Sequence, residues 1–187
     1  MAGGAGRSPG QTQARASMES DLSLSRGGSP VVPGASRPVI IAAEDPAQPD
    51  ILALLATADA YYRALYPPES NHLLDVEALR GSDVRFLVAR AGGRALGTGA
   101  LAWRGAFVEI KRMWVDPAAR GLGLGRRMLG ALETLARAEG AAVLHLETGV
   151  RQPAALALYR SAGFAQTGPF GDYHPDPLSL FFVKALA

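Results

Sequence analysis

From residue 38 onward, apolar residues recur with two periods, one of about 3.6 residues and one of about two residues. The longer period predicts a helix at 49–66, which the two prolines after it end because neither can continue the hydrogen-bond ladder. It also predicts a short helix at 75–80, a helix of roughly 17 residues before Gly140, and a last helix from Pro153 to Gly163. Glycines at these ends are typical helix caps.

The shorter period predicts strands in the remaining segments. Residues 84–103 form a hairpin that turns at Gly92-Gly93, and the other strands lie at 38–44, 106–115, 142–148, 165–168 and 178–184. The resulting order of elements predicts an α/β fold with a mixed sheet of seven strands and helices on both of its faces. The connection from 106–115 through a helix to 142–148 should be parallel and right-handed.

The first 37 residues differ from the rest of the chain. They contain seven glycines, seven serines, three prolines and no aromatic residue. Such a segment cannot bury enough apolar surface to balance its ordering entropy, so we expect a disordered tail at 1–37 and one domain at 38–187. The tail also carries the net charge of +2, which leaves the domain neutral and without an electrostatic argument for nucleic-acid binding.

Composition excludes some chemistry. The chain has no cysteine, so it has no disulfide framework, no thiolate metal site and no cysteine nucleophile. No apolar run approaches the ~18 residues that span a bilayer, and the N-terminus lacks the apolar centre of a secretory signal. We therefore expect a soluble, cytoplasmic protein without a membrane partner.

The stretch "DPAARGLGLGRRML" at 116–129 places three glycines at alternate positions where a helix begins. Glycine costs a helix about 1 kcal/mol relative to alanine, so the glycines require a reason. The first N–H groups of a helix lack internal partners and lie at the positive end of its dipole, which makes them an anion site that glycine leaves accessible. Arg120, Arg126 and Arg127 add positive charge.

Neither of two common phosphate loops matches this stretch. An ATP-binding loop needs Gly-Lys-Ser/Thr, and the dinucleotide loop needs G-x-G-x-x-G after an early βαβ unit. A turn that needs small residues for packing is the alternative. The stretch "VDPAARGLGLGRRML" instead resembles the signature of the GNAT superfamily of N-acyltransferases, with Arg120, Gly123 and Gly125 at its fixed positions. A later stretch, "ALALYRSAGF" at 155–164, resembles the family's late helix, which carries a tyrosine and ends in Gly-Phe.

The resemblance implies acetyl-CoA as co-substrate and a GNAT-like sheet whose central parallel pair of strands splays apart. The pantetheine arm would pair with the strand before the loop, and an amide there would polarise the thioester carbonyl. Gln152 stands where many relatives have asparagine, which makes its contact with the cofactor arm less secure. The residues that would bind the cofactor are Met113, Trp114, Val115, Arg120, Gly121, Leu122, Gly123, Leu124, Gly125, Arg126 and Gln152.

The same resemblance implies a reaction in which an amine attacks the thioester directly within a ternary complex. An alkyl amine is largely protonated at pH 7, so a base must remove its proton. Glu109 ranks first as that base and Glu147 second, although either could be an ion-paired strand carboxylate, and Lys111 and Arg112 offer partners to Glu109. Tyr159 matches the family's tyrosine and would reprotonate the leaving thiolate, the alternative being a core tyrosine.

The acceptor side is expected between two turn-rich segments, "YPPESNHLL" at 66–74 and "GPFGDYHPDPLS" at 168–179. Acidic and aromatic side chains there would suit a cationic amine, the alternative being solvated loops. The candidate substrate-binding residues are His72, Asp172, Tyr173 and His174. No third ligand is suitably spaced to join His72 and His174, so we expect no metal.

We therefore expect an acetyl-CoA-dependent N-acetyltransferase acting on the amine of a small molecule. The alternatives are a protein or peptide N-acetyltransferase and a non-catalytic module that senses acyl-CoA. The identity of the acceptor and the oligomeric state, including a homodimer, stay open.

Overall fold

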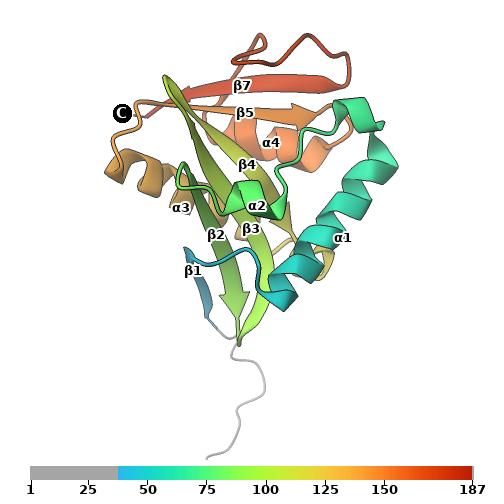
Figure 1. Cartoon of the computed structure of the whole chain (residues 1–187), viewed down its shortest axis with the longest axis vertical. Coiled ribbons are helices and arrows are strands. Elements are labelled where there is room, and N and C mark those ends of the chain that lie inside the picture. The colour runs from blue at the N-terminus through green and yellow to red at the C-terminus, as the bar shows by residue number, and fades with distance from the viewer. Residues whose placement is uncertain (1–37, 187) are drawn as a thin grey trace, which may run out of the picture. The chain divides into compact units, whose positions relative to one another are not determined.

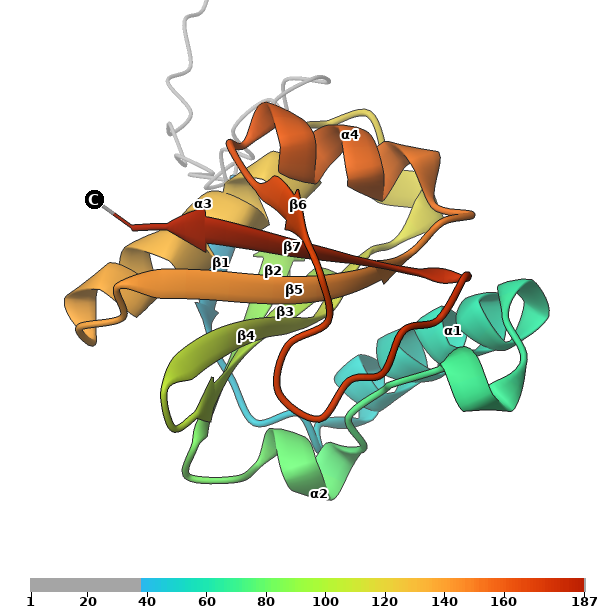
Figure 2. The same ribbon diagram turned by 90° about the horizontal axis from the view of Figure 1, so that it is seen from above.

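The computed structural model describes residues 38–186, so the predicted tail at 1–37 lies outside the described residues. These residues form a sheet with helices on both faces (Figures 1 and 2). The strands are β1 (Val39–Ala43), β2 (Val84–Ala91), β3 (Arg94–Arg104), β4 (Phe107–Val115), β5 (Val143–Gly149), β6 (Ala165–Thr167) and β7 (Ser179–Ala185). The helices are α1 (Pro49–Leu65), α2 (Val76–Leu79), α3 (Leu124–Ala138) and α4 (Pro153–Ser161), with 3₁₀ turns at Pro68–Ser70 and Pro117–Ala119.

The seven strands lie in the order β1-β2-β3-β4-β5-β7-β6. All neighbours are antiparallel except β4 and β5, which are parallel as the crossover through α3 predicted. The predicted elements are confirmed with shifts of a few residues at their ends. Helix α3 has 15 residues rather than roughly 17, because the glycine-rich stretch stays outside it up to Gly123.

Strands β4 and β5 pair only from Val108–Ile110 to Leu144–Leu146, although both strands continue past these residues. The expected splay of the central pair is therefore confirmed. Beyond it, β5 remains paired with β7 and β4 remains paired with β3. The gap between the two central strands opens toward the N-terminal end of α3, where β4 leads into the glycine-rich stretch.

Two apolar clusters cover the two faces of the sheet. Helix α3 packs Met128, Leu129 and Leu132 against one face, where Tyr159 of α4 joins them. Helices α1 and α2 pack against the other face, as Figure 2 shows with the sheet between the two pairs of helices. Because side chains alternate along a strand, β4 sends Val108 and Ile110 to the α3 face. Its intervening residues, among them the candidate base Glu109, project to the face that carries α1.

A bulge interrupts β4 at Arg112, and nothing in the hydrophobic pattern predicted it. Arg112 has a φ of 54°, and the register of β3 against β4 shifts between Thr98 and Ala100. The Thr98 hydroxyl donates a hydrogen bond to the Arg112 carbonyl at 2.8 Å, and the guanidinium lies 2.6 Å from the Asp59 carboxylate of α1. These contacts fix the bulge, which releases part of β4 from its ladder with β3 beside the gap.

Candidate active site

The glycine-rich stretch forms an uncapped helix entrance. Gly121 and Gly123 have φ values of 79° and 69°, and a Cβ atom on either would meet nothing within 4 Å. Open space and a left-handed backbone together leave their amides accessible. Gly123 is the N-cap of α3 and supplies no side-chain hydrogen bond, so the first N–H groups of the helix have no partner within it. The entrance therefore has the properties of an anion site.

The predicted cofactor-binding residues around this helix entrance have different surroundings. The Arg120 guanidinium lies 5.1 Å from the ring centroid of Trp114 and 5.6 Å from that of Tyr61. Arg126 reaches Ser161 of α4, and the side chain of Leu122 is 72% exposed. Leu124 is buried in the core and Gly125 lies against Leu158, so both can face the anion site only through their backbone. Arg127 donates to the Val39 carbonyl at 2.7 Å.

On strand β4, Met113, Trp114 and Val115 follow the bulge. The Tyr62 hydroxyl of α1 donates a hydrogen bond to the Met113 carbonyl at 3.0 Å, which ties α1 to the strand beside the gap. Trp114 is buried on the α1 side against Tyr61 and Tyr62. Its indole N–H has no hydrogen-bond partner among the described residues.

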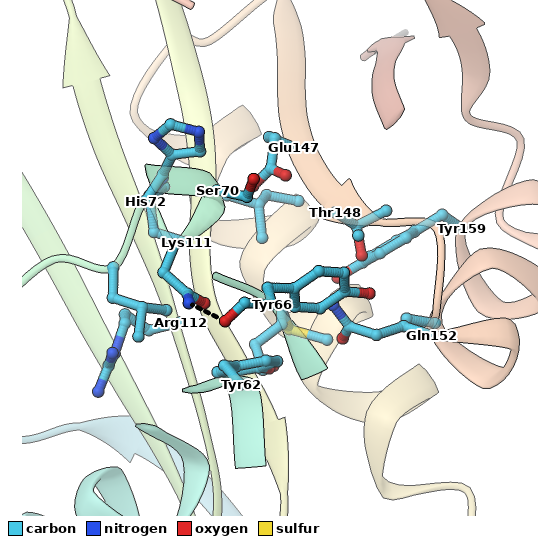
Figure 3. A pocket seen from close by; sticks show the side chains of 16 residues that line it. Tyr62, Tyr66, Ser70, His72, Lys111, Arg112, Glu147, Thr148, Gln152 and Tyr159 are labelled. Atoms are coloured by element: carbon cyan, nitrogen blue, oxygen red, sulfur yellow. Dashed lines mark hydrogen bonds between the residues drawn. The ribbon is translucent and has the colours of Figure 1, made fainter. Parts of the chain in front are cut away.

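A pocket of about 90 Å³, here called the inner pocket, occupies the gap between β4 and β5 (Figure 3). Glu147 enters it from β5, and Tyr159 enters it from α4 on the opposite face of the sheet. Both reach one pocket because the strands have separated there. Its lining is Tyr62, Tyr66, Ser70, Asn71, His72, Leu73, Ile110, Lys111, Arg112, Met113, Glu147, Thr148, Gly149, Gln152, Ala155 and Tyr159.

Burial sets the protonation of the two candidate groups. It raises the pKa of the Glu147 carboxyl above its ordinary value, although the Ser179 hydroxyl, which donates to Oε1 at 2.6 Å, acts in the opposite direction. Burial also raises the pKa of the Tyr159 phenol, so this side chain keeps its proton at neutral pH. The inner pocket therefore joins a carboxylate with increased proton affinity to a neutral phenol.

Gln152 lines the inner pocket beside Tyr66, to whose hydroxyl its side chain is hydrogen-bonded. The same hydroxyl accepts a hydrogen bond from the Arg151 amide at 2.8 Å. The Tyr66 ring packs directly on Gly149, where a Cβ atom would lie 2.1 Å from the ring. The C-terminal end of α1 is thereby fixed to the turn between β5 and α4.

A second pocket of about 900 Å³, here called the outer pocket, lies between the segments 67–74 and 170–178. It contains the other candidate base, because Glu109 projects into it from β4. The Tyr173 hydroxyl donates to Glu109 Oε1 at 2.6 Å and accepts a hydrogen bond from Lys111 Nζ at 2.7 Å. The candidate substrate-binding residues His72, Asp172, Tyr173 and His174 all line this pocket.

The two pockets are neighbours that share Ser70, His72 and Lys111 in their walls. The structure thus brings Glu147, Tyr159 and Gln152 together and sets Glu109 apart from them in the outer pocket. Within residues 38–186, no group of three His, Asp or Glu side chains could hold a metal ion, and no helix is long and apolar enough to cross a membrane.

Sequence reasoning missed several residues of these walls. Lys111 follows Glu109 by two positions on a strand, so the two had to share a face, but Lys111 was considered only as a partner for the carboxylate. Tyr62 lies within the predicted helix at 49–66, and nothing in the sequence indicates its contact with β4. Ser179 and Tyr66 lie far from Glu147 and Gln152 in the chain, so only folding reveals those contacts.

Known proteins resemble this chain over most of the described residues. The model of the acetyltransferase (GNAT) family matches residues 51–164. An IAA acetyltransferase of Azospirillum brasilense is 53% identical over 150 residues, which cover 79% of this chain and 98% of the relative. An N-alpha-acetyltransferase RimI of Mycobacterium tuberculosis is 39% identical over 87 residues, which cover 44% of this chain and 53% of that protein.

Among solved structures, that of a Klebsiella pneumoniae protein described as an acyl-CoA N-acyltransferase is 36% identical, with a TM-score of 0.68 and coverage of 80% of this chain and 98% of the other. The PaiA N-acetyltransferase of Thermoplasma acidophilum, solved in complex with coenzyme A, has a TM-score of 0.63 and covers 79% of this chain and 99% of its own. Its identity is 15%, so it shows a likeness of fold.

Proposed function

We propose that this chain, which belongs to the acetyltransferase (GNAT) family, transfers the acetyl group of acetyl-CoA to the amine of a small molecule. Dependence on acetyl-CoA and acetyltransferase activity follow from family membership. The choice of acceptor and the roles of individual residues are our proposal. The main observation in support of the residue roles is the inner pocket, which Glu147 and Tyr159 line from opposite faces of the sheet.

The residues at the entrance of α3 suit a pyrophosphate. Gly121 and Gly123 leave space that a Cβ atom would fill, and the uncapped helix presents N–H groups and a positive dipole end. We assign pyrophosphate binding to the backbone of residues 121–126, with Arg120 held close by on the rings of Trp114 and Tyr61. When bound, acetyl-CoA supplies an activated acetyl group and a thiolate leaving group.

In the inner pocket, Glu147 is the proposed general base. A substrate amine arrives mostly as an ammonium, and a carboxylate whose pKa is raised by burial accepts its proton more readily than an exposed one would. Lys111 and His72 lower the pKa of Glu147, which counteracts part of the effect of burial. Glu109 is the weaker candidate because its carboxylate already accepts a hydrogen bond from Tyr173 and lies 3.3 Å from Lys111 Nζ.

Tyr159 is the proposed general acid. Its phenol is buried, lines the inner pocket and retains its proton at neutral pH because burial raises its pKa. The thiol that forms has a pKa near 8.5, below that of the phenol, so this proton transfer is uphill and depends on the phenol lying beside the leaving sulfur. The phenolate formed is then reprotonated by solvent or by the next substrate.

Two observations support a small molecule as acceptor over a protein terminus. The segment 170–178 folds back over the sheet, where Tyr173 bonds to Glu109 and the Asp176 carboxylate is hydrogen-bonded to Ser70 of the facing segment. These contacts tie the two segments together across the outer pocket, which leaves less room for a peptide than an open groove would. The Azospirillum relative, which this chain spans almost completely, is named an IAA acetyltransferase.

A panel of amines tests this proposal. The purified protein is incubated with acetyl-CoA and each amine, and the release of free thiol is followed together with the mass of the product. We expect thiol release that depends on a small amine and yields the acetylated amine. Acetylation of peptide N-termini alone would overturn the choice of acceptor, and binding of acetyl-CoA without turnover would favour the sensor alternative.

A further inference from the structure

The strongest unexplained feature of the described residues is a set of five packed aromatic rings, of which Phe107, Phe170 and Tyr173 line the outer pocket. We call the rings of Phe107, His145, Phe170, Tyr173 and Phe181 the ring cluster. Neighbouring centroids lie 4.7 to 5.9 Å apart, and each of these pairs meets edge-to-face or tilted. His72 extends the cluster from the other segment, 5.0 Å from Tyr173 at an interplanar angle of 89°.

The cluster forms because three strands send alternate residues to the same face of the sheet. Phe107 comes from β4, His145 from the parallel β5 and Phe181 from β7, and the segment after β6 lays Phe170 and Tyr173 over them. Burial lowers the pKa of His145, so its ring, which packs against Phe107 and Phe170, is neutral at pH 7 and adds no positive charge to the cluster.

Packing within the protein does not cover the whole surface of these rings. Phe107, Phe170 and Tyr173 are half-buried and line the outer pocket, so part of each ring faces it. An aromatic ligand placed against such rings gains edge-to-face contacts beyond its buried area, which an aliphatic ligand of similar size does not. The pocket wall thus distinguishes two ligands of equal length by their shape and π electrons.

The charges around the outer pocket favour a cation. Its lining contains four carboxylates, on Glu69, Glu109, Asp172 and Asp176, against the two cations Arg104 and Lys111. Both cations are already paired, because Arg104 lies 2.8 Å from Asp83 and Lys111 lies 3.3 Å from Glu109. The negative excess and the faces of the rings both attract an ammonium group.

From these observations we infer that the acceptor is an aryl-alkyl amine, whose aromatic ring binds in the outer pocket against the ring cluster and whose amine reaches Glu147 in the inner pocket. This inference rests on the proposed function. The two pockets have Ser70, His72 and Lys111 in common, and the inference requires the alkyl arm to pass beside these residues. No covalent step is added, since the amine enters the acetyl transfer already described.

Matched amines test the inference. With acetyl-CoA saturating, kcat/KM is compared for phenethylamine and hexylamine, which carry similar charge and length but differ in the ring. We expect phenethylamine to be preferred by about tenfold, the factor that a few aromatic contacts provide. Equal values for the two amines would overturn the inference and leave the proposed function intact.

Two variants test whether the preference for phenethylamine over hexylamine depends on the ring cluster. Phe170→Leu keeps an apolar side chain but removes the ring, so the preference should fall to less than about threefold. Trp103→Leu is the matched control, because Trp103 packs on the α3 face of the sheet and the preference should be retained. An unchanged preference in Phe170→Leu, with the fold intact by circular dichroism, would contradict the assignment.

Binding gives a readout that does not need turnover. Calorimetry on the CoA-saturated protein should show tighter binding of phenethylamine than of hexylamine, again by about tenfold. If no amine of the panel is acetylated, the proposed function fails, while the calorimetric ratio still decides whether the outer pocket selects aromatic rings.

Discussion

The Tyr173 hydroxyl, on the segment between β6 and β7, donates a hydrogen bond of 2.6 Å to the Glu109 carboxylate on β4. Lys111 donates to the same hydroxyl and lies within ion-pair distance of Glu109, so the three side chains form one hydrogen-bonded polar group. Glu109 thereby fastens the segment 170–178 to the sheet. Glu147, which accepts a hydrogen bond from the Ser179 hydroxyl, faces the inner pocket instead.

This difference predicts how the two carboxylates respond to substitution. Glu147→Gln should lower kcat by about 10²- to 10⁴-fold, the usual contribution of a general base. Glu109→Gln should affect KM for the amine more than kcat, because it loosens the outer pocket. Steady-state kinetics of both variants measure this. A larger loss of kcat in Glu109→Gln would restore Glu109 as the first candidate.

The pH dependence of activity should reflect the ionisation of the Glu147 carboxyl. Activity requires its ionised form, so kcat/KM should rise with pH through its pKa, and burial places that rise above the ordinary range of a glutamate. Ser179→Ala removes a hydrogen bond that lowers this pKa, so the acidic limb should move to higher pH. Thr134→Ala, on the exposed side of α3, is the control that should not move it. A limb unaffected by Ser179→Ala would exclude Glu147 as the titrating group.

Tyr159→Phe tests the proposed acid. The phenylalanine ring fills the same space among Phe164 and Phe182, so the fold should persist while the proton donor is lost. We expect kcat to fall by about 100-fold or more with little change in the affinity for acetyl-CoA. Stopped-flow measurement of thiol release separates the chemical step from binding. If kcat of the variant stayed within about threefold of the unmodified protein, Tyr159 would serve only in core packing and not as the acid.

The helix entrance predicts a contrast between two glycines of one segment. Gly123→Ala puts a Cβ on a left-handed residue, which costs about 1–2 kcal/mol of stability, and it also narrows access to the amides, so affinity for CoA should fall. Gly130→Ala lies in the exposed interior of α3 with open space around it and should stabilise the fold by up to about 1 kcal/mol. Calorimetry with CoA and thermal unfolding measure both. Equal CoA affinities in the two variants would contradict the anion site.

The ion pair behind the β4 bulge predicts a stability effect. The Arg112 side chain is only 4% exposed, and Arg112→Met would leave Asp59 with only the longer contact to the exposed Arg63, at 3.7 Å. We expect a loss of about 3 kcal/mol in the free energy of unfolding, less if water reaches Asp59, whose side chain is 23% exposed. Adding Asp59→Asn should recover part of the loss. Urea unfolding of the single and double variants provides the coupling free energy.

The sequence by itself determined the elements and their order. The periods of 3.6 and two residues are local consequences of helix and strand geometry, so α1, α3 and the hairpin at Gly92-Gly93 could be placed from the residues alone. The anion site at α3 was likewise readable, since glycines before a helix act through their own backbone. These features depend on neighbours in the chain.

Tertiary structure decided which distant side chains meet. Glu109 and Glu147 both lie on central strands, and no periodicity reveals that the strands separate after Ile110 and Leu146. The separation lets Tyr159 from one face and Glu147 from the other line a single pocket. The bulge at Arg112 depends on contacts with Asp59 and Thr98 that lie far from it in the chain, so packing rather than local propensity placed the site.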